Sequence, residues 1–153
     1  MNKKEKPLEE AIREMCEGES FAVLATQGNG QPYASLIGFA TSADLTHLVF
    51  ATPKQTRKYA LLEKNNLVAL LVDTRSSQPD HINELSALTI TGKSEIISNP
   101  DEKNQWSALL SEKHPYLQDF LASQDTAIVV VEVSKYLYVR RFQEVSEWIP
   151  VCL

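Results

Sequence analysis

The chain passes from a strand pattern to a helical pattern within the stretch His47-Leu-Val-Phe-Ala-Thr-Pro-Lys-Gln-Thr-Arg-Lys-Tyr59. The apolar run at 47–52 predicts a strand, and the pattern from 56 to 65 predicts a helix. The start of a helix carries backbone N–H groups without partners and the positive end of the helix dipole. Hydroxyls and cations gather at this same turn: Thr52, Lys54, Thr56, Arg57 and Lys58.

This cluster of cations stands out because the formal net charge of the whole chain is -5. Hydroxyl donors and cations at a helix start form a suitable site for a phosphate group. The turn therefore predicts a bound anion. A capped helix with a solvated cationic face is the alternative explanation of the same residues.

The segments on both sides of the turn predict a sheet interrupted by helices. Residues 8–15 show helical spacing, and Gly18 ends that helix. Further strands are expected at 20–26, 31–41, 67–73, 85–97, 127–133 and 136–140. The turn at 27–30 joins the first two of these into a hairpin. Gly92, inside the long strand at 85–97, marks a bulge or a close approach of two backbones.

Two more helices are expected after the strand at 85–97. Asn99 caps the first and Pro100 occupies its first turn, while the second starts near His114. About six or seven strands in mostly hairpin order, with flanking helices, predict a mainly β fold built as a small antiparallel barrel. The length of 153 residues fits one domain over 1–153.

The composition excludes several classes of protein. Hydrophobic residues make up 43% of the chain and charged residues 23%, which is ordinary for a globular protein. The acidic balance argues against general nucleic-acid binding, and no stretch is long and apolar enough to span a membrane. The N-terminal cations at 1–6 lack the apolar core of a signal peptide. Cys16 and Cys152 are expected to be free thiols, and the protein is expected in the cytoplasm.

The order of these segments resembles the FMN-binding split-barrel family typified by pyridoxamine 5′-phosphate oxidase. The resemblance covers residues 8 to 142. It rests on Phe21-Ala-Val-Leu-Ala-Thr26, Gly30-Gln-Pro-Tyr-Ala-Ser35, Phe39-Ala40, Phe50-Ala-Thr52 with Thr56-Arg-Lys58, and Leu88-Thr-Ile-Thr-Gly92.

This resemblance implies an antiparallel split barrel and a homodimer that binds two FMN molecules in clefts between the subunits. It assigns the FMN phosphate to the turn described above, to Thr52, Thr56, Arg57 and Lys58. Ser35 would contact the ribityl chain or the ring edge, and Asn83 the ring. Trp148 is expected to lie beyond the last strand, in a tail that could reach the partner's cofactor. Trp106 is expected in the core or an interface.

The end of the chain departs from the parent oxidase. That enzyme's Arg-Leu-His-Asp-Arg motif is replaced here by Val139-Arg-Arg-Phe-Gln143, and no histidine follows His114. Oxidation of vitamin B6 is therefore not expected. Residues 138–148 are closer to the end of the haem-utilisation branch, although arginine and glutamine flank Phe142 where that branch shows Gly-Phe-Gly. The chain is also shorter than that branch, which carries an additional C-terminal domain.

The leading hypothesis is a flavin-dependent oxidoreductase in which the bound cofactor carries the redox chemistry. No catalytic side chain is assigned, and the scattered histidines and cysteines show no metal-ligand spacing. A non-catalytic flavin or haem carrier on the same barrel and a dimeric interaction domain with an empty phosphate turn are the alternatives. Deazaflavin is a further cofactor that the same turn would suit.

Overall fold

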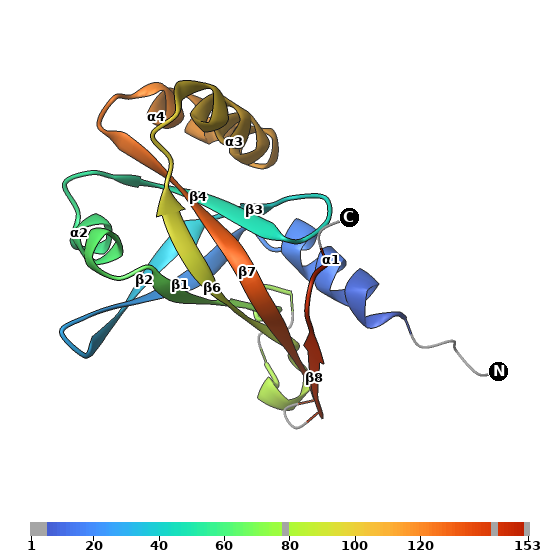
Figure 1. The fold of residues 1–153 in the computed structure, drawn as a ribbon. Coiled ribbons are helices and arrows are strands. Elements are labelled where there is room, and N and C mark those ends of the chain that lie inside the picture. Colours follow the sequence, from blue (N-terminus) through green and yellow to red (C-terminus); the bar gives the residue numbers. More distant parts are fainter. Residues whose placement is uncertain (1–5, 78–79, 142–143, 152–153) are drawn as a thin grey trace.

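The computed structural model describes residues 6–77, 80–141 and 144–151 (Figure 1). Its helices are α1 (Leu8–Gly18), α2 (Arg57–Lys64), α3 (Pro100–Lys113) and α4 (Gln118–Ala122), with short 3-10 helices η1 (Ile82–Glu84) and η2 (Pro115–Leu117). Its strands are β1 (Phe21–Gly28), β2 (Gln31–Gly38), β3 (Ala40–Thr41), β4 (His47–Pro53), β5 (Leu67–Asp73), β6 (Ala87–Ile96), β7 (Thr126–Arg140) and β8 (Glu144–Trp148). No helix in the described ranges is long and apolar enough to cross a membrane.

The strands form one antiparallel sheet in the order β2-β1-β5-β6-β7-β4-β3, and β8 pairs with β7 beside this path. The sheet curls so that β2 comes near β4, although the two do not pair (Figure 1). This incomplete closure confirms the expected antiparallel split barrel with flanking helices. The sheet has eight strands within the described ranges instead of six or seven, since β3 and β8 had not been expected as separate strands.

The barrel interior follows from the alternation of apolar residues along each strand. The register places Leu24, Leu70, Ile90 and Tyr136 in one row across β1, β5, β6 and β7, and each is at most 1% exposed. Burying each of the three aliphatic side chains in this row contributes about 1.5–3 kcal/mol. Helix α1 adds Ile12, Met15 and Cys16 to this core, while α3 and α4 pack on the outer face of β4 and β7. Cys16 is a free, buried thiol, and Cys152 lies outside the described residues.

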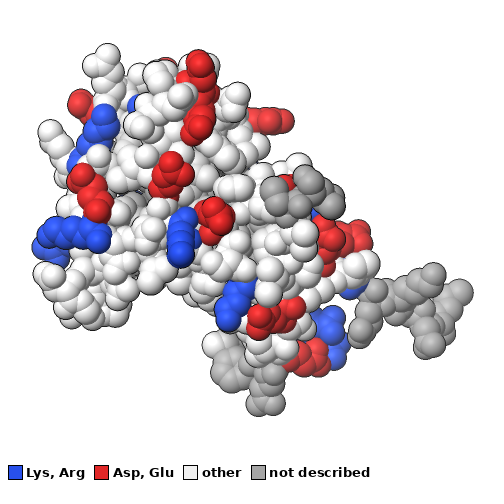
Figure 2. Space-filling model, in the orientation of Figure 1, with Lys and Arg blue, Asp and Glu red and all other residues white. Residues whose placement is uncertain are grey.

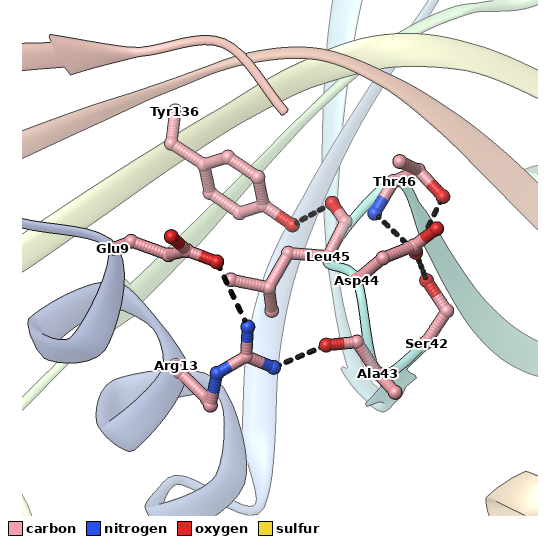
Figure 3. Close-up of polar contacts among 8 residues, drawn as sticks. All are labelled: Glu9, Arg13, Ser42, Ala43, Asp44, Leu45, Thr46 and Tyr136. Atoms are coloured by element: carbon pink, nitrogen blue, oxygen red, sulfur yellow. Dashed lines mark hydrogen bonds and ion pairs between the residues drawn. The ribbon is translucent and has the colours of Figure 1, made fainter. Parts of the chain in front are cut away.

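The two turns that lead into β2 and β4 are held by local contacts. Asn29 and Gly30 have φ angles of 54° and 80°, as a two-residue hairpin turn requires, which confirms the expected turn at 27–30. Before β4, Leu45 has a φ of 62°, and its carbonyl oxygen accepts a hydrogen bond of 2.7 Å from the hydroxyl of Tyr136 (Figure 3). Figure 3 also shows Asp44 accepting hydrogen bonds from two neighbouring side chains, those of Ser42 and Thr46.

Asp44 and Arg13 fix the remaining groups of this second turn. The Oδ1 atom of Asp44 accepts from the Thr46 hydroxyl at 2.6 Å, from the Thr46 N–H at 3.1 Å and from the Ser42 hydroxyl at 2.8 Å. These bonds, those of Thr46 first, lower the pKa of Asp44 to about 2. Arg13 of α1 donates to the carbonyl oxygen of Ala43, so that the helix is tied to the turn (Figure 3).

Strand β7 is one continuous strand, so the expectation of two strands at 127–133 and 136–140 is wrong. Thr91 faces Lys135 while the next residue, Gly92, faces Val133, which leaves Ser134 as an extra residue in β7. The extra residue of this β-bulge interrupts the alternation of buried and exposed positions along β7. In the sequence, that interruption resembles a break between two strands. The bulge expected at Gly92 is confirmed. A Cβ atom on Gly92 would lie 2.3 Å from a backbone oxygen of β7, so the expected close approach is confirmed as well.

Candidate functional site

The turn between β4 and α2 presents two hydroxyls in contact. Thr56 caps α2, since its Oγ1 accepts from the Tyr59 N–H at 3.2 Å and donates to the Pro53 carbonyl oxygen at 2.9 Å. The Oγ1 of Thr52, a residue with 0% exposure, lies 3.1 Å from the Oγ1 of Thr56. The N–H groups of Arg57, the first residue of α2, and of the residue after it have no acceptor inside the helix. The turn thus joins hydroxyls to N–H donors at the positive end of a helix dipole.

Two cationic side chains lie at the same turn. The guanidinium carbon of Arg57 lies 5.8 Å from the centroid of the Tyr33 ring on β2. Lys58 is half-buried, and burial lowers the pKa of its ammonium group below the usual value. An anion beside Lys58 would offset this cost of burying a charge. The N–H of Lys54 donates to the Asp125 carbonyl oxygen at 2.8 Å, which ties the turn to the segment before β7.

Ser35 carries a buried hydroxyl with no hydrogen-bond partner among the described residues. It lies on β2 opposite Leu24 of β1, and therefore on the inner face of the barrel, on the strand that comes near β4. Buried hydroxyls in folded proteins are nearly always hydrogen-bonded. The orphaned oxygen of Ser35 is the feature expected where a bound group supplies the missing partner.

Asn83 and Trp148 do not lie at this turn. Thr52 faces Ala127 near the start of β7, whereas the first residue of β6 faces Val139 near its end. Asn83, in η1 just before β6, is therefore at the opposite end of β7 from the turn. Figure 1 shows α2 at the left of the barrel and β8, which carries Trp148, at its lower end. Within one chain, the structure groups Thr52 with Thr56, Arg57 and Lys58 and leaves Asn83 and Trp148 apart.

The expectation that Trp148 lies in a tail beyond the last strand is wrong. Trp148 is the last residue of β8 and faces Tyr136 of β7, with the two ring centroids 5.7 Å apart. It is half-buried against the main core. Trp106, on α3, packs against the outer cluster under α3 and α4, in agreement with its expected place in a core.

A polar hollow of about 650 Å³ surrounds Asn83 at this far end. Its lining comes from the segment before β6 and the end of β7, and consists of Thr74, Ser77, Asn83, Glu84, Ser86, Arg140 and Arg141. The guanidinium of Arg140 donates to Glu144 at 3.2 Å. The hollow therefore offers amide, hydroxyl and guanidinium donors beside acidic groups.

The outer face of β2, β1 and β5 is apolar, and no helix of the described ranges lies over it. The register sets Leu36, Val23 and Leu71 side by side, followed by Thr89 of β6. Leu36 is 68% exposed and Leu71 is 38% exposed. The neighbouring row contains the alanines Ala34, Ala25 and Ala69. We call this surface, with Phe21 and Leu67 at its rim, the apolar face.

The three histidines are held in separate places. His114 is 2% exposed, and its Nε2 donates to the Phe39 carbonyl oxygen at 2.9 Å. The ring of His47 lies 5.7 Å from that of Trp106, and His81 is exposed before η1. No group of three His, Cys, Asp or Glu side chains in the described part of the chain could hold a metal ion. On the face shown in Figure 2, acidic and basic side chains are mixed and form no broad basic area.

Tyr33 is the residue that sequence reasoning missed. It occurs in the quoted stretch Gly30-Gln-Pro-Tyr-Ala-Ser35, but no local pattern connects it with Arg57 on a distant helix. Only the curling of the sheet brings β2 beside the start of α2, where the Tyr33 ring lies under the guanidinium group.

Solved structures with similar folds come from several bacteria. The heme binding protein from Mycobacterium smegmatis superposes with a TM-score of 0.82 at 16% identity, over 95% of this chain and 59% of that chain. ChuZ from Campylobacter jejuni gives 0.80 at 14% identity, over 96% and 62% of the two chains. General Stress Protein 26 from Bacillus anthracis str. Sterne gives 0.70 at 18% identity, over 93% and 98%.

At these identities the neighbours establish the fold alone. This chain spans less than two thirds of the heme binding protein and of ChuZ. A search of curated proteins gives no significant match. The sequence profile of the family described as pyridoxamine 5′-phosphate oxidase matches residues 8–140, which is most of the chain. The chain therefore belongs to the pyridoxamine 5′-phosphate oxidase family.

Proposed function

We propose that this protein binds FMN at the turn between β4 and α2 and acts as a flavin-dependent oxidoreductase. The observation that carries the proposal is the set of donors at this turn together with the orphaned hydroxyl of Ser35 on the neighbouring strand β2. Family membership supports the same cofactor.

The donors suit the phosphate of FMN. A phosphate group carries a charge near -2 and accepts several hydrogen bonds. The Thr56 hydroxyl, which donates to the Pro53 carbonyl oxygen in the structure, would turn its hydrogen to the phosphate, and the buried Thr52 hydroxyl, 3.1 Å from it, would support it. The first N–H groups of α2 point along the helix axis at the same place. Arg57 and Lys58 supply the two positive charges. A half-buried lysine whose ammonium is destabilised by burial gains from an anion more than an exposed lysine would.

Ser35 suits the ribityl chain or the ring edge. Its buried hydroxyl makes no hydrogen bond to the described residues, so it is able both to donate one and to accept one. A buried hydroxyl without a partner destabilises the protein, and a hydrogen bond from Ser35 to the cofactor would remove this cost on binding. Bound FMN would supply hydride acceptance at N5, with reoxidation by dioxygen or another acceptor. The residues named here hold the cofactor and orient it.

We extend the proposal to a homodimer joined through the apolar face. A monomer rarely leaves a contiguous apolar surface of this kind in water, and a second copy of the same face is self-complementary under two-fold symmetry. Asn83 and Trp148 are remote from the phosphate turn of their own chain. Their expected contacts with the cofactor therefore require the partner's Asn83 and the partner's Trp148.

The test is FMN binding by the purified protein, followed by absorbance and by quenching of flavin fluorescence. The variant carrying Arg57→Ala and Lys58→Ala is expected to lose FMN while its circular dichroism stays unchanged. The control carries Lys64→Ala and Lys93→Ala, which removes the same charge from exposed positions away from the turn. Stoichiometric yellow cofactor in the Arg57/Lys58 variant would overturn the assignment.

Haem binding is the second candidate, favoured by the fold shared with the heme binding protein from Mycobacterium smegmatis. The same absorbance spectrum separates the candidates, because haem gives a Soret band and flavin gives bands in the blue. Deazaflavin would bind through the same phosphate turn and is distinguished by its shorter-wavelength absorbance. Turnover of the bound flavin with reduced nicotinamide would separate an enzyme from a carrier.

A further inference from the structure

Tyr33 connects the β1–β2 hairpin to the phosphate turn. Its ring is half-buried, and the guanidinium carbon of Arg57 lies 5.8 Å from the ring centroid. The backbone at Tyr33 is fixed by its pairing with Thr26 of β1 and by a 3.4 Å hydrogen bond from the Thr26 hydroxyl to the Tyr33 carbonyl oxygen. Thr26 is 3% exposed. The ring is therefore carried by a strand residue whose backbone is paired on the β1 side.

A second contact fixes the position of α2 on the same hairpin. Leu61 of α2 packs closely on Gly28. A Cβ atom added to Gly28 would lie 2.3 Å from the Cδ2 atom of Leu61. Gly28 is the last residue of β1, directly before the hairpin turn. Helix α2 therefore has a defined place on the end of β1, and from there the Arg57 side chain reaches the Tyr33 ring on β2.

Arg57 has no salt bridge to an acidic side chain among the described residues. Its side chain is exposed, and a free arginine samples many rotamers that binding an anion must restrict. A cation held over an aromatic ring has fewer rotamers to lose. Fixing a binding group before the ligand arrives raises affinity by lowering this entropy cost.

We propose that Tyr33 is a positioning residue of the phosphate site, holding the Arg57 guanidinium where the phosphate binds. This inference rests on the proposed function, since it concerns how the same site recognises FMN. The ring acts through Arg57 and does not itself contact the phosphate. It should therefore favour FMN over riboflavin, which has the same ring system and ribityl chain but no phosphate.

The test compares the affinities of FMN and riboflavin, measured by fluorescence quenching, in the wild type and in Tyr33→Leu. Tyr33→Leu is expected to weaken FMN binding about 3- to 10-fold and to leave riboflavin binding unchanged. Tyr33→Phe keeps the ring and is expected to bind both flavins like the wild type. In an Arg57→Ala background, Tyr33→Leu is expected to have no further effect on FMN.

Two other outcomes overturn the inference. Equal weakening of FMN and riboflavin in Tyr33→Leu, or full weakening in the Arg57→Ala background, would assign Tyr33 a purely structural role. If Tyr33→Leu does not fold, Tyr33→Thr removes the ring with a residue favoured in strands, and the same two results decide. Wild-type protein that binds neither flavin would refute the proposed function. Loss of the preference for FMN over riboflavin would bear on the role of Tyr33 and leave the proposed function standing.

Discussion

Replacing Gly92 by alanine tests how closely β6 packs on β7 at the bulge. A Cβ atom at this position would lie 2.3 Å from the Glu132 carbonyl oxygen and 2.8 Å from the Val131 Cγ1 atom. An ordinary contact begins near 3.4 Å, so the oxygen has to move by about 1 Å (3.4 minus 2.3). That oxygen belongs to the backbone of a buried ladder, where it cannot turn away as the end of a side chain could.

The expected cost follows from this displacement. Overpacking a well-filled interior costs about 1–3 kcal/mol, and a backbone obstacle in the middle of a sheet places Gly92→Ala at the upper end, about 3 kcal/mol. For a domain of this size, 1 kcal/mol lowers Tm by about 2–4 °C. Gly92→Ala should therefore lower Tm by about 6–12 °C.

Thermal and urea unfolding followed by circular dichroism measure this change. Gly18→Ala is the matched control, because a Cβ atom on Gly18 meets nothing within 4 Å. Gly18 ends α1 and has no positive φ, so its substitution should change stability little. If the stability of Gly92→Ala were within about 0.5 kcal/mol of the wild type, the close packing at the bulge would be refuted.

Three further predictions concern the apolar face and two titrating side chains. Leu36→Asp should convert a dimer into a monomer in sedimentation experiments, whereas Ala108→Asp, which adds the same charge on exposed α3, should not; a dimeric Leu36→Asp would contradict the proposed interface. Burial lowers the pKa of Lys113 from 10.5 to about 8, and between these pH values the unfolded chain binds more protons than the folded one, so the free energy of unfolding should rise from pH 8 to 10.5. Urea unfolding at several pH values should show this rise in the wild type and not in Lys113→Met. The pKa of Asp44 is about 2 in the folded chain and 3.8 in the unfolded chain, so its contribution to the free energy of unfolding is complete above pH 3.8 and is lost as the pH falls through 2. Asp44→Asn should lack this acid-dependent loss in acid unfolding, and an acid transition equal to that of the wild type would contradict the reasoning.

The local turns and caps could be predicted because each depends on a few neighbouring residues. Asn29 and Gly30 tolerate positive φ. Thr56 caps α2 through its hydroxyl, and the Asn99 side chain caps α3 by accepting from the second and third residues of that helix. These features arise from backbone geometry within one turn of chain. Their prediction therefore needed no knowledge of what packs beside them.

The end of the chain was less predictable. Ser134 interrupts the alternation of β7, and only the register against β6 shows that the strand continues through a bulge. Strand β8 is exposed along most of its length, so it lacks the alternation that marks a strand with one buried face. Its pairing with β7 places Trp148 on Tyr136, which no local pattern of residues indicated.

The sequence by itself determined the cationic turn before α2, because its hydroxyls, cations and helix start all lie within one short stretch around Thr56 and Arg57. The tertiary structure alone decided what surrounds that turn. The curled sheet brought Tyr33 under Arg57 and placed Asn83 at the far end of β7. It also buried the Ser35 hydroxyl without a hydrogen-bond partner in the part of the chain that the structure describes. The physical reason is that strand pairing joins residues distant in the chain, and its register is set by which faces the whole barrel buries.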